Sequence, residues 1–138
     1  MDQVIRMLIV EDEAILAMNL MVYIQRFGWD VMTASSGQQT LSIADSFRPD
    51  VLLLDYRLPD MTGFEVLDTM RADCGRYRCN NGCILMTAHP TAMVLADAEQ
   101  RGIDRILYKP FSLTELDTHL FAAATALRLP SLFGPLGG

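Results

Sequence analysis

Five residues that could take part in metal or phosphoryl chemistry stand where short apolar runs of the sequence end. They are Glu11, Asp12, Asp55, Thr87 and Lys109, the last being the only lysine of the chain. Carboxylates gathered within a few ångströms repel one another unless a cation lies between them. Mg²⁺ prefers oxygen ligands, while an ammonium group and a hydroxyl each suit one oxygen of an anion. If the fold gathers these residues, they predict a magnesium-dependent phosphoryl site.

The elements that must position these residues alternate along the whole chain. Residues 51–55 (VLLLD) are the clearest strand, because a short aliphatic run is typical of a strand buried on both faces. Residues 14–27 are expected to form a helix that ends before Gly28, with apolar residues at helical spacing at Ile15, Leu16, Leu20, Ile24 and Phe27. We expect strands over 4–10, 30–34, 51–55, 83–87 and 104–108, and helices over 14–27, 36–47, 64–71, 91–101 and 112–127.

Five strand–helix repeats predict an α/β fold with a five-stranded parallel, doubly wound sheet and five helices. A closed barrel would need eight repeats. In an open sheet of this kind the ligand site lies outside the carboxyl ends of the strands. Asp55 stands alone at the end of a central strand and is the expected nucleophile that carries an acyl phosphate. Glu11 and Asp12 form a pair suited to the metal.

Composition and charge narrow the class of protein. A chain of 138 residues is enough for one domain, and 51% hydrophobic residues supply a real core. The formal net charge of −6 argues against direct contact with nucleic acid. The N-terminal apolar run is too short for a membrane span or a signal peptide, so we expect a cytoplasmic protein with no membrane contact. We place the domain over 1–128 and a C-terminal tail, rich in proline and glycine, over 129–138.

Four segments resemble the receiver domain of bacterial response regulators. They are LIVEDE at 8–13, VLLLDYRLPDMTG at 51–63, ILMTA at 84–88 and LYKPF at 107–111. The resemblance covers about residues 4–127 and implies the flavodoxin-like fold of these domains. It also implies a phosphorylation-dependent switch of a two-component system or phosphorelay, similar to the stand-alone chemotaxis receivers. A sensor histidine kinase or a phosphotransfer protein would then supply the phosphoryl group, although a receiver excised from a longer protein fits the sequence equally.

The resemblance assigns a role to each motif residue. It makes Asp55 the phosphoryl acceptor, with Mg²⁺ (or Mn²⁺ in its place) held by Glu11, Asp12 and Asp55, Asp12 more directly than Glu11. It further implies a metal contact from the backbone carbonyl of Arg57, a switch hydroxyl on Thr87, a phosphoryl-oxygen contact from Lys109 and a cis peptide bond at Pro110.

One position departs from the family pattern. The family usually has Tyr or Phe three residues before the lysine, a ring that turns inward with the threonine, and this sequence has Ile106 there. Tyr108 lies on the same side of the strand and is the candidate substitute. Phosphorylation adds roughly −1.5 to −2 charges and would bias the fourth helix, fifth strand and fifth helix, residues 90–127. This surface would bind a downstream protein.

Two other functions share features with the receiver interpretation. A haloacid dehalogenase-type phosphohydrolase also uses a strand-end aspartate with Mg²⁺, but it needs a second Asp where this chain has Arg57. A pseudo-receiver that only binds partners is opposed by the complete acid set. We expect a phospho-acceptor rather than an enzyme, with only intrinsic autophosphorylation and autodephosphorylation. At the mouth of the site, Arg57 and His89 are candidates to tune hydrolysis, and His89 is equally explained as an exposed loop residue.

The three cysteines are an odd number, which excludes complete pairing. We expect reduced thiols, as is usual in the cytoplasm. Cys74, Cys79 and Cys83 lie in or near the polar segment 72–82, at a spacing that matches no common zinc pattern. Loop or buried thiols are therefore the favoured interpretation.

Overall fold

A single parallel sheet with the strand order β2-β1-β3-β4-β5 forms the centre of the protein. The computed structural model describes the backbone of residues 4–137 and the side chains of residues 4–127. The strands are β1 (Arg6–Val10), β2 (Asp30–Ala34), β3 (Val51–Asp55), β4 (Gly82–Thr87) and β5 (Arg105–Tyr108). The helices are α1 (Ala14–Gln25), α2 (Gly37–Phe47), α3 (Gly63–Arg71), α4 (Ala92–Gln100) and α5 (Leu113–Gly137).

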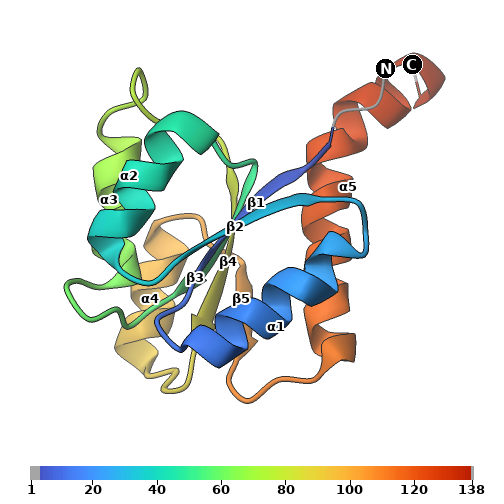
Figure 1. Cartoon of the computed structure of the whole chain (residues 1–138). Coiled ribbons are helices and arrows are strands. Elements are labelled where there is room, and N and C mark those ends of the chain that lie inside the picture. The colour runs from blue at the N-terminus through green and yellow to red at the C-terminus, as the bar shows by residue number, and fades with distance from the viewer. Residues whose placement is uncertain (1–3, 138) are drawn as a thin grey trace.

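The helices cover both faces of the sheet. Helices α1 and α5 lie on one face and α2, α3 and α4 on the other, while the strands run side by side between them (Figure 1). Every strand pair is parallel, because each helix carries the chain back to the edge where the previous strand began. The predicted five-stranded doubly wound fold is confirmed.

The surroundings of strand β3 explain why its sequence is uniformly aliphatic. Leu52 and Leu54 belong to the core between the sheet and α2, α3 and α4. Val51 and Leu53 belong to the core between the sheet and α1 and α5. All four are fully buried, so neither face of this strand has a place for a polar side chain until the strand ends at Asp55.

Local capping sets where the helices begin. Ser36, Thr62 and Thr91 each accept a hydrogen bond from the backbone N–H three residues later, with N···O distances of 3.0 to 3.2 Å. At the start of α5, the Ser112 hydroxyl accepts from the Glu115 N–H at 3.1 Å and the Ser112 N–H donates to the Glu115 carboxylate, which together form a capping box. Gly28 follows α1 with φ of +82°, a conformation that suits glycine.

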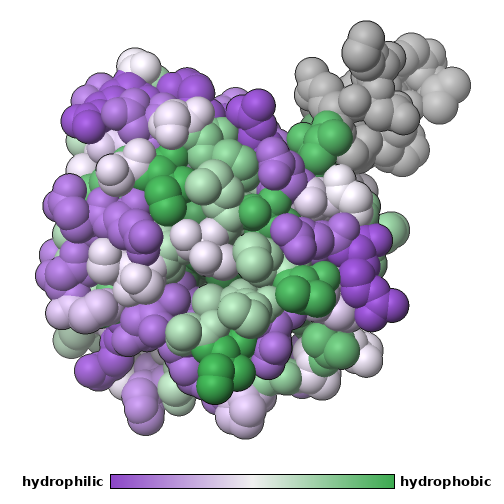
Figure 2. Space-filling model, viewed as in Figure 1, coloured by the Kyte–Doolittle hydropathy of each residue, from purple (hydrophilic) through white to green (hydrophobic). Residues whose placement is uncertain are grey.

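Helix α1 buries a narrower face than its sequence predicts. Leu20 and Ile24 are in the core as expected. Ile15, which also fits the helical spacing, is 73% exposed. The helix ends at Gln25 rather than at the expected Phe27, and Phe27 is 50% exposed in the turn that follows. Figure 2 shows hydrophobic side chains gathered over α1 and the edge strand β2, and hydrophilic ones over α2. The apolar spacing therefore predicted the helix correctly. It did not predict which of the apolar residues are buried by neighbouring elements.

The end of α5 corrects the predicted helix boundary. The expected end was near Leu127, yet the backbone is helical through Gly137. A proline removes one backbone donor, and a helix can continue past it with a kink, so proline after residue 127 was an insufficient stop signal. The predicted tail 129–138 falls where no side chain is described. Within the described residues, no helix has the length and hydropathy needed to cross a bilayer.

The structure also corrects the expectation that all three cysteines are reduced thiols. Cys74 and Cys79 form a disulfide in the segment between α3 and β4, and Cys83 on β4 is free. An odd number of cysteines excludes complete pairing but leaves room for one bond, so the expectation of three reduced thiols went further than the count allows.

Candidate functional site

The carboxyl ends of the strands bring the predicted residues into one pocket of about 430 Å³. Glu11 follows β1, Asp55 ends β3, Thr87 ends β4 and Lys109 follows β5. The pocket is lined by Glu11, Asp12, Glu13, Asp55, Tyr56, Arg57, Leu58, Pro59, Thr87, Ala88, His89 and Lys109. A parallel sheet ends all its strands at one edge, which is why residues far apart in the sequence meet here.

Lys109 joins the two buried carboxylates. Its ammonium group donates to Asp55 Oδ2 at 2.9 Å and also to Glu11 Oε1. The side chains of Glu11, Asp55 and Lys109 are only 1%, 10% and 19% exposed. Charges this deep need partners, because water no longer solvates them fully. The lysine therefore holds both carboxylates at fixed positions in the pocket.

Three carboxylates converge on one point of the pocket. Glu11, Asp12 and Asp55 each offer an oxygen, and the three oxygens lie within 4.8 Å of one another. With Lys109 the ionised side chains sum to −2, which is the charge that one divalent cation neutralises. Mg²⁺ is commonly bound by one or two carboxylates together with water and phosphate oxygens, so this donor set fits it.

Burial and neighbouring charges have opposite effects on the pKa values of Glu11 and Lys109. Burial raises the pKa of the Glu11 carboxyl, and the hydrogen bonds from Lys109 and from the Glu13 N–H oppose it without cancelling it. For Lys109, burial acts to lower the pKa, but the hydrogen bonds and charges of Glu11 and Asp55 outweigh it, so its pKa is raised. The lysine is thus firmly protonated and able to contact an anionic oxygen.

Thr87 is buried at the end of β4, with 2% of its surface exposed. Its hydroxyl oxygen accepts a hydrogen bond from the His89 N–H at 3.1 Å, and its carbonyl accepts from the Lys109 N–H at 2.9 Å. The His89 side chain is exposed at the mouth of the same pocket. Thr87 therefore links the pocket to the segment that leads into α4.

The loop between β3 and α3 is held by residues that the sequence analysis did not single out. The Asp60 carboxylate accepts from the N–H groups of Gly37 and Gln38 at 2.8 and 2.9 Å, at the first turn of α2. A Cβ on Gly63 would lie 2.5 Å from the carbonyl oxygen of Asp55, so only glycine fits there. The turn-forming residues PDMTG at 59–63 indicate a loop here, but they do not indicate which groups the loop contacts.

The remaining predicted residues are placed as follows. The Lys109–Pro110 peptide bond is cis, as expected. The Arg57 N–H lies 3.3 Å from Asp55 Oδ1, and its exposed side chain borders the pocket. Ile106 packs against the core on the α4 side, whereas Tyr108 is 45% exposed and does not line the pocket. The assignment of Tyr108 as a switch aromatic stays a prediction.

Comparison with known proteins identifies this arrangement. The family model of the response regulator receiver domain matches residues 7–121. The chain belongs to this family. The receiver domain is 36% identical over 116 residues to the transcriptional regulatory protein TrcR of Mycobacterium tuberculosis, an alignment that covers 84% of this chain and 44% of that protein. It is 34% identical over 122 residues to the probable transcriptional regulatory protein TcrX of the same organism, covering 87% and 50%.

Solved structures show the same fold for this receiver domain. The signal receiver domain of a putative LuxO repressor protein from Vibrio parahaemolyticus superposes with a TM-score of 0.83 at 26% identity, covering 94% of this chain and 97% of that one. The Vibrio cholerae chemotaxis protein CheY4 superposes with a TM-score of 0.78 at 26% identity, covering 88% and 99%. The chain spans about half the length of the curated relatives it matches.

Proposed function

We propose that this receiver domain accepts a phosphoryl group on Asp55 from a sensor histidine kinase or a phosphotransfer protein. The single observation that carries the proposal is the contact of Lys109 with both Asp55 and Glu11 in a pocket with an excess of negative charge. A carboxylate at the end of a stiff central strand, beside a fixed ammonium group, is suited to attack phosphorus.

The transfer forms one bond and breaks one. A carboxylate oxygen of Asp55 attacks the phosphorus, the bond from phosphorus to the donor nitrogen breaks, and an aspartyl phosphate forms. Lys109 contacts a phosphoryl oxygen while keeping its proton, since the charges around it favour the ammonium form. Transfer of this kind depends on positioning and on neutralising charge rather than on further covalent steps.

The residues proposed to hold Mg²⁺ are Glu11, Asp12, Asp55 and the backbone carbonyl of Arg57. Bound there, the ion would offset the charge of the carboxylates and of the incoming phosphoryl oxygens. Asp12 is exposed, which leaves its oxygens accessible to a hydrated ion. Arg57 and His89 border the mouth of the pocket, where we propose that they control the approach of water to the aspartyl phosphate.

The proposed output runs from Thr87 to the surface of α4, β5 and α5. A phosphoryl group on Asp55 adds acceptor oxygens that compete for the Thr87 hydroxyl and for Lys109. Thr87 stands directly before the segment that enters α4, and Lys109 lies four positions before Leu113, where α5 begins. Large hydrophobic side chains are exposed on this surface at Met93, Tyr108 and Leu113, which suits contact with a downstream protein.

Intact-mass spectrometry after incubation with Mg²⁺ and acetyl phosphate tests the proposal. The wild-type chain should gain the mass of one phosphoryl group, and Asp55→Asn should gain none. Asp30→Asn is the matched control, because Asp30 is exposed at the start of β2 and does not line the pocket. It should be phosphorylated as the wild type is. An adduct of equal size on Asp55→Asn would contradict the assignment.

A further inference from the structure

The segment between α3 and β4 carries two cysteines that the phosphoryl site does not use. Residues 72–81 lie before β4, at the sheet edge opposite to the carboxyl ends of the strands (Figure 1). We propose that Cys74 and Cys79 are a reversible thiol–disulfide exchange site, opened by a thiol reductant and closed by a disulfide oxidant. The proposal does not depend on the function of Asp55, because the two sites occupy opposite edges of the sheet.

The loop around the two cysteines is held in place by contacts other than the disulfide. Tyr77, between them, is 4% exposed and belongs to the core. Arg76 pairs with Asp45 of α2 at 3.1 Å, and Arg78 pairs with Asp50 before β3. These anchors fix the residues between Cys74 and Cys79, so both cysteines remain close when the bond is open. Closure then requires no large movement of the chain.

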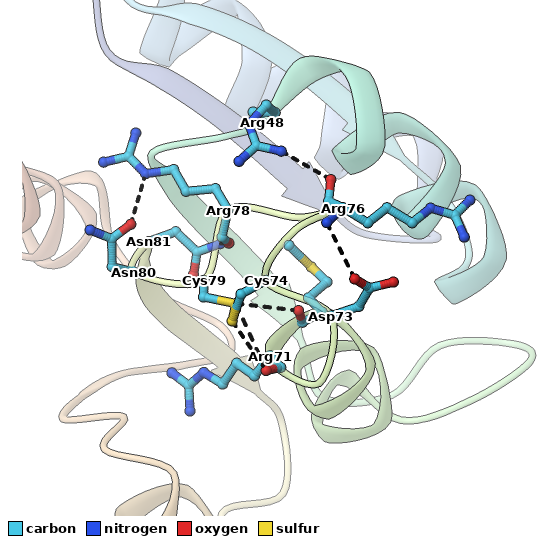
Figure 3. Close-up of a disulfide and its surroundings, with 10 residues drawn as sticks. Arg48, Arg71, Asp73, Cys74, Arg76, Arg78, Cys79, Asn80 and Asn81 are labelled. Carbon is cyan, nitrogen blue, oxygen red and sulfur yellow. Dashed lines mark hydrogen bonds between the residues drawn. A yellow bond between two sulfur atoms is a disulfide. The ribbon is translucent and has the colours of Figure 1, made fainter.

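Each sulfur also has a hydrogen-bond acceptor ready for its reduced form (Figure 3). Cys74 Sγ lies 3.4 Å from the carbonyl oxygen of Arg71, at the end of α3. Cys79 Sγ lies 3.6 Å from the carbonyl oxygen of Met70 and 3.8 Å from that of Arg71. A disulfide has no proton to donate, but two thiols could each donate to these carbonyls at the helix end. Both redox forms are therefore accommodated by the same backbone.

The exposure of the two residues sets the order of the exchange. Cys74 is exposed, whereas Cys79 is half-buried. An incoming thiolate attacks Cys74 Sγ, the bond between the cysteines breaks, and Cys79 leaves as a thiolate that takes up a proton. A second reductant thiolate then attacks the reductant sulfur bound to Cys74, which releases Cys74 as the second thiol. Two electrons and two protons pass to the protein, and two reductant thiols become one disulfide.

Cys83 does not compete for this exchange. It is the free cysteine of the described part of the chain and belongs to β4. Burial raises the pKa of its thiol to about 12, which keeps it protonated and a poor nucleophile. Cys83→Ala therefore supplies a matched control that removes a thiol without touching the pair.

Peptide mapping of the full chain in glutathione buffers tests the proposal. Protein reduced with dithiothreitol is exposed to oxidised glutathione, free thiols are blocked, and the linked peptides are identified by mass. The wild type and Cys83→Ala should both form the Cys74–Cys79 link, and fresh dithiothreitol should reopen it. Cys79→Ser should collect glutathione on Cys74, and Cys74→Ser should collect it on Cys79 severalfold more slowly.

Three results would overturn the proposal. The wild type could stay fully reduced at every glutathione ratio, or it could link Cys83 in place of one member of the pair. Equal rates of glutathione uptake in Cys74→Ser and Cys79→Ser would contradict the assigned order of attack. Circular dichroism of each variant separates these results from a failure to fold. None of them bears on whether Asp55 accepts a phosphoryl group, so the two proposals fail independently.

Discussion

Charged side chains are arranged differently at the two edges of the sheet. At the carboxyl edge, three carboxylates share one lysine around a pocket, and the sum of the charges is −2. At the opposite edge, Arg76 pairs with Asp45 and Arg78 pairs with Asp50. Paired charges leave no excess to neutralise, whereas the excess negative charge of the cluster costs stability until a cation arrives. The excess negative charge therefore marks the carboxyl edge as the one that favours a bound cation.

Removing Lys109 should give the largest effect on stability at the carboxyl edge. Lys109→Met leaves Glu11 and Asp55 buried without their cation, and we expect the free energy of unfolding to fall by about 3 kcal/mol in metal-free buffer. Mg²⁺ should restore part of the loss, because it supplies the missing positive charge. Urea unfolding with and without Mg²⁺ measures both. If the variant were as stable as the wild type in metal-free buffer, the buried carboxylates would not depend on the lysine charge.

Opening the disulfide should give the next largest effect, at the opposite edge. The bond closes a ring of six residues, since its cysteines are separated by five positions. Chain-entropy arguments give about 2 kcal/mol for a ring of this length. We expect urea unfolding in dithiothreitol to show a loss of this size for the wild type and for Cys83→Ala. Cys74→Ser combined with Cys79→Ser should show no further loss on reduction; an equal loss would place the effect elsewhere.

Replacing an aspartate by asparagine should lower the free energy of unfolding at one edge and raise it at the other. Asp50 accepts from the Arg6 N–H at 2.8 Å and pairs with Arg78, so Asp50→Asn should cost about 2 kcal/mol. Asp12 is exposed in the unbalanced cluster, so Asp12→Asn should gain about 0.5 kcal/mol in metal-free buffer. Thermal or urea unfolding in a chelator measures the pair. If both variants lose stability, the contrast between the edges does not hold.

Asp60 should give the smallest effect, visible as a dependence on pH. The N–H groups of Gly37 and Gln38 hold the pKa of its carboxyl below the usual value. The ionised form therefore stabilises the folded state at neutral pH, and this contribution is lost as the pH falls through the lowered pKa. The difference in urea midpoint between wild type and Asp60→Asn should shrink on acidification. A difference that stays constant with pH would contradict the role of the carboxylate charge.

The order of elements, and the meeting of Glu11, Asp12, Asp55, Thr87 and Lys109 in one pocket, could be predicted because both rest on local patterns. The run VLLLD at 51–55 places Asp55 at a strand end before any contact is known, and parallel strands end at one edge. The contact between Asp60 and Gly37 could not be predicted, because it joins residues 23 positions apart through the packing of a loop on α2. The exposure of Ile15 likewise depends on which helices lie beside α1, and spacing alone does not give this.

The pairing of the cysteines could not be predicted from the sequence either. Counting them decides whether all can pair, but pairing of two depends on how the loop folds. Here Tyr77 enters the core and the arginines on either side of it bind acids of other elements, which brings Cys74 and Cys79 to a Cα–Cα distance of 5.2 Å. The C-terminal helix was similarly misjudged, because proline and glycine content indicates a tendency to end a helix without fixing its last residue.

The most direct test of Asp55 as the phosphoryl acceptor locates the phosphoryl group in the protein without any substitution. After incubation with Mg²⁺ and acetyl phosphate, borohydride reduces an aspartyl phosphate to homoserine, and fragmentation of the tryptic peptide that ends at Arg57 identifies the position. We expect homoserine at Asp55 alone, and none when Mg²⁺ is chelated. Homoserine at Asp12, or at Asp55 to the same extent without a divalent cation, would contradict this expectation.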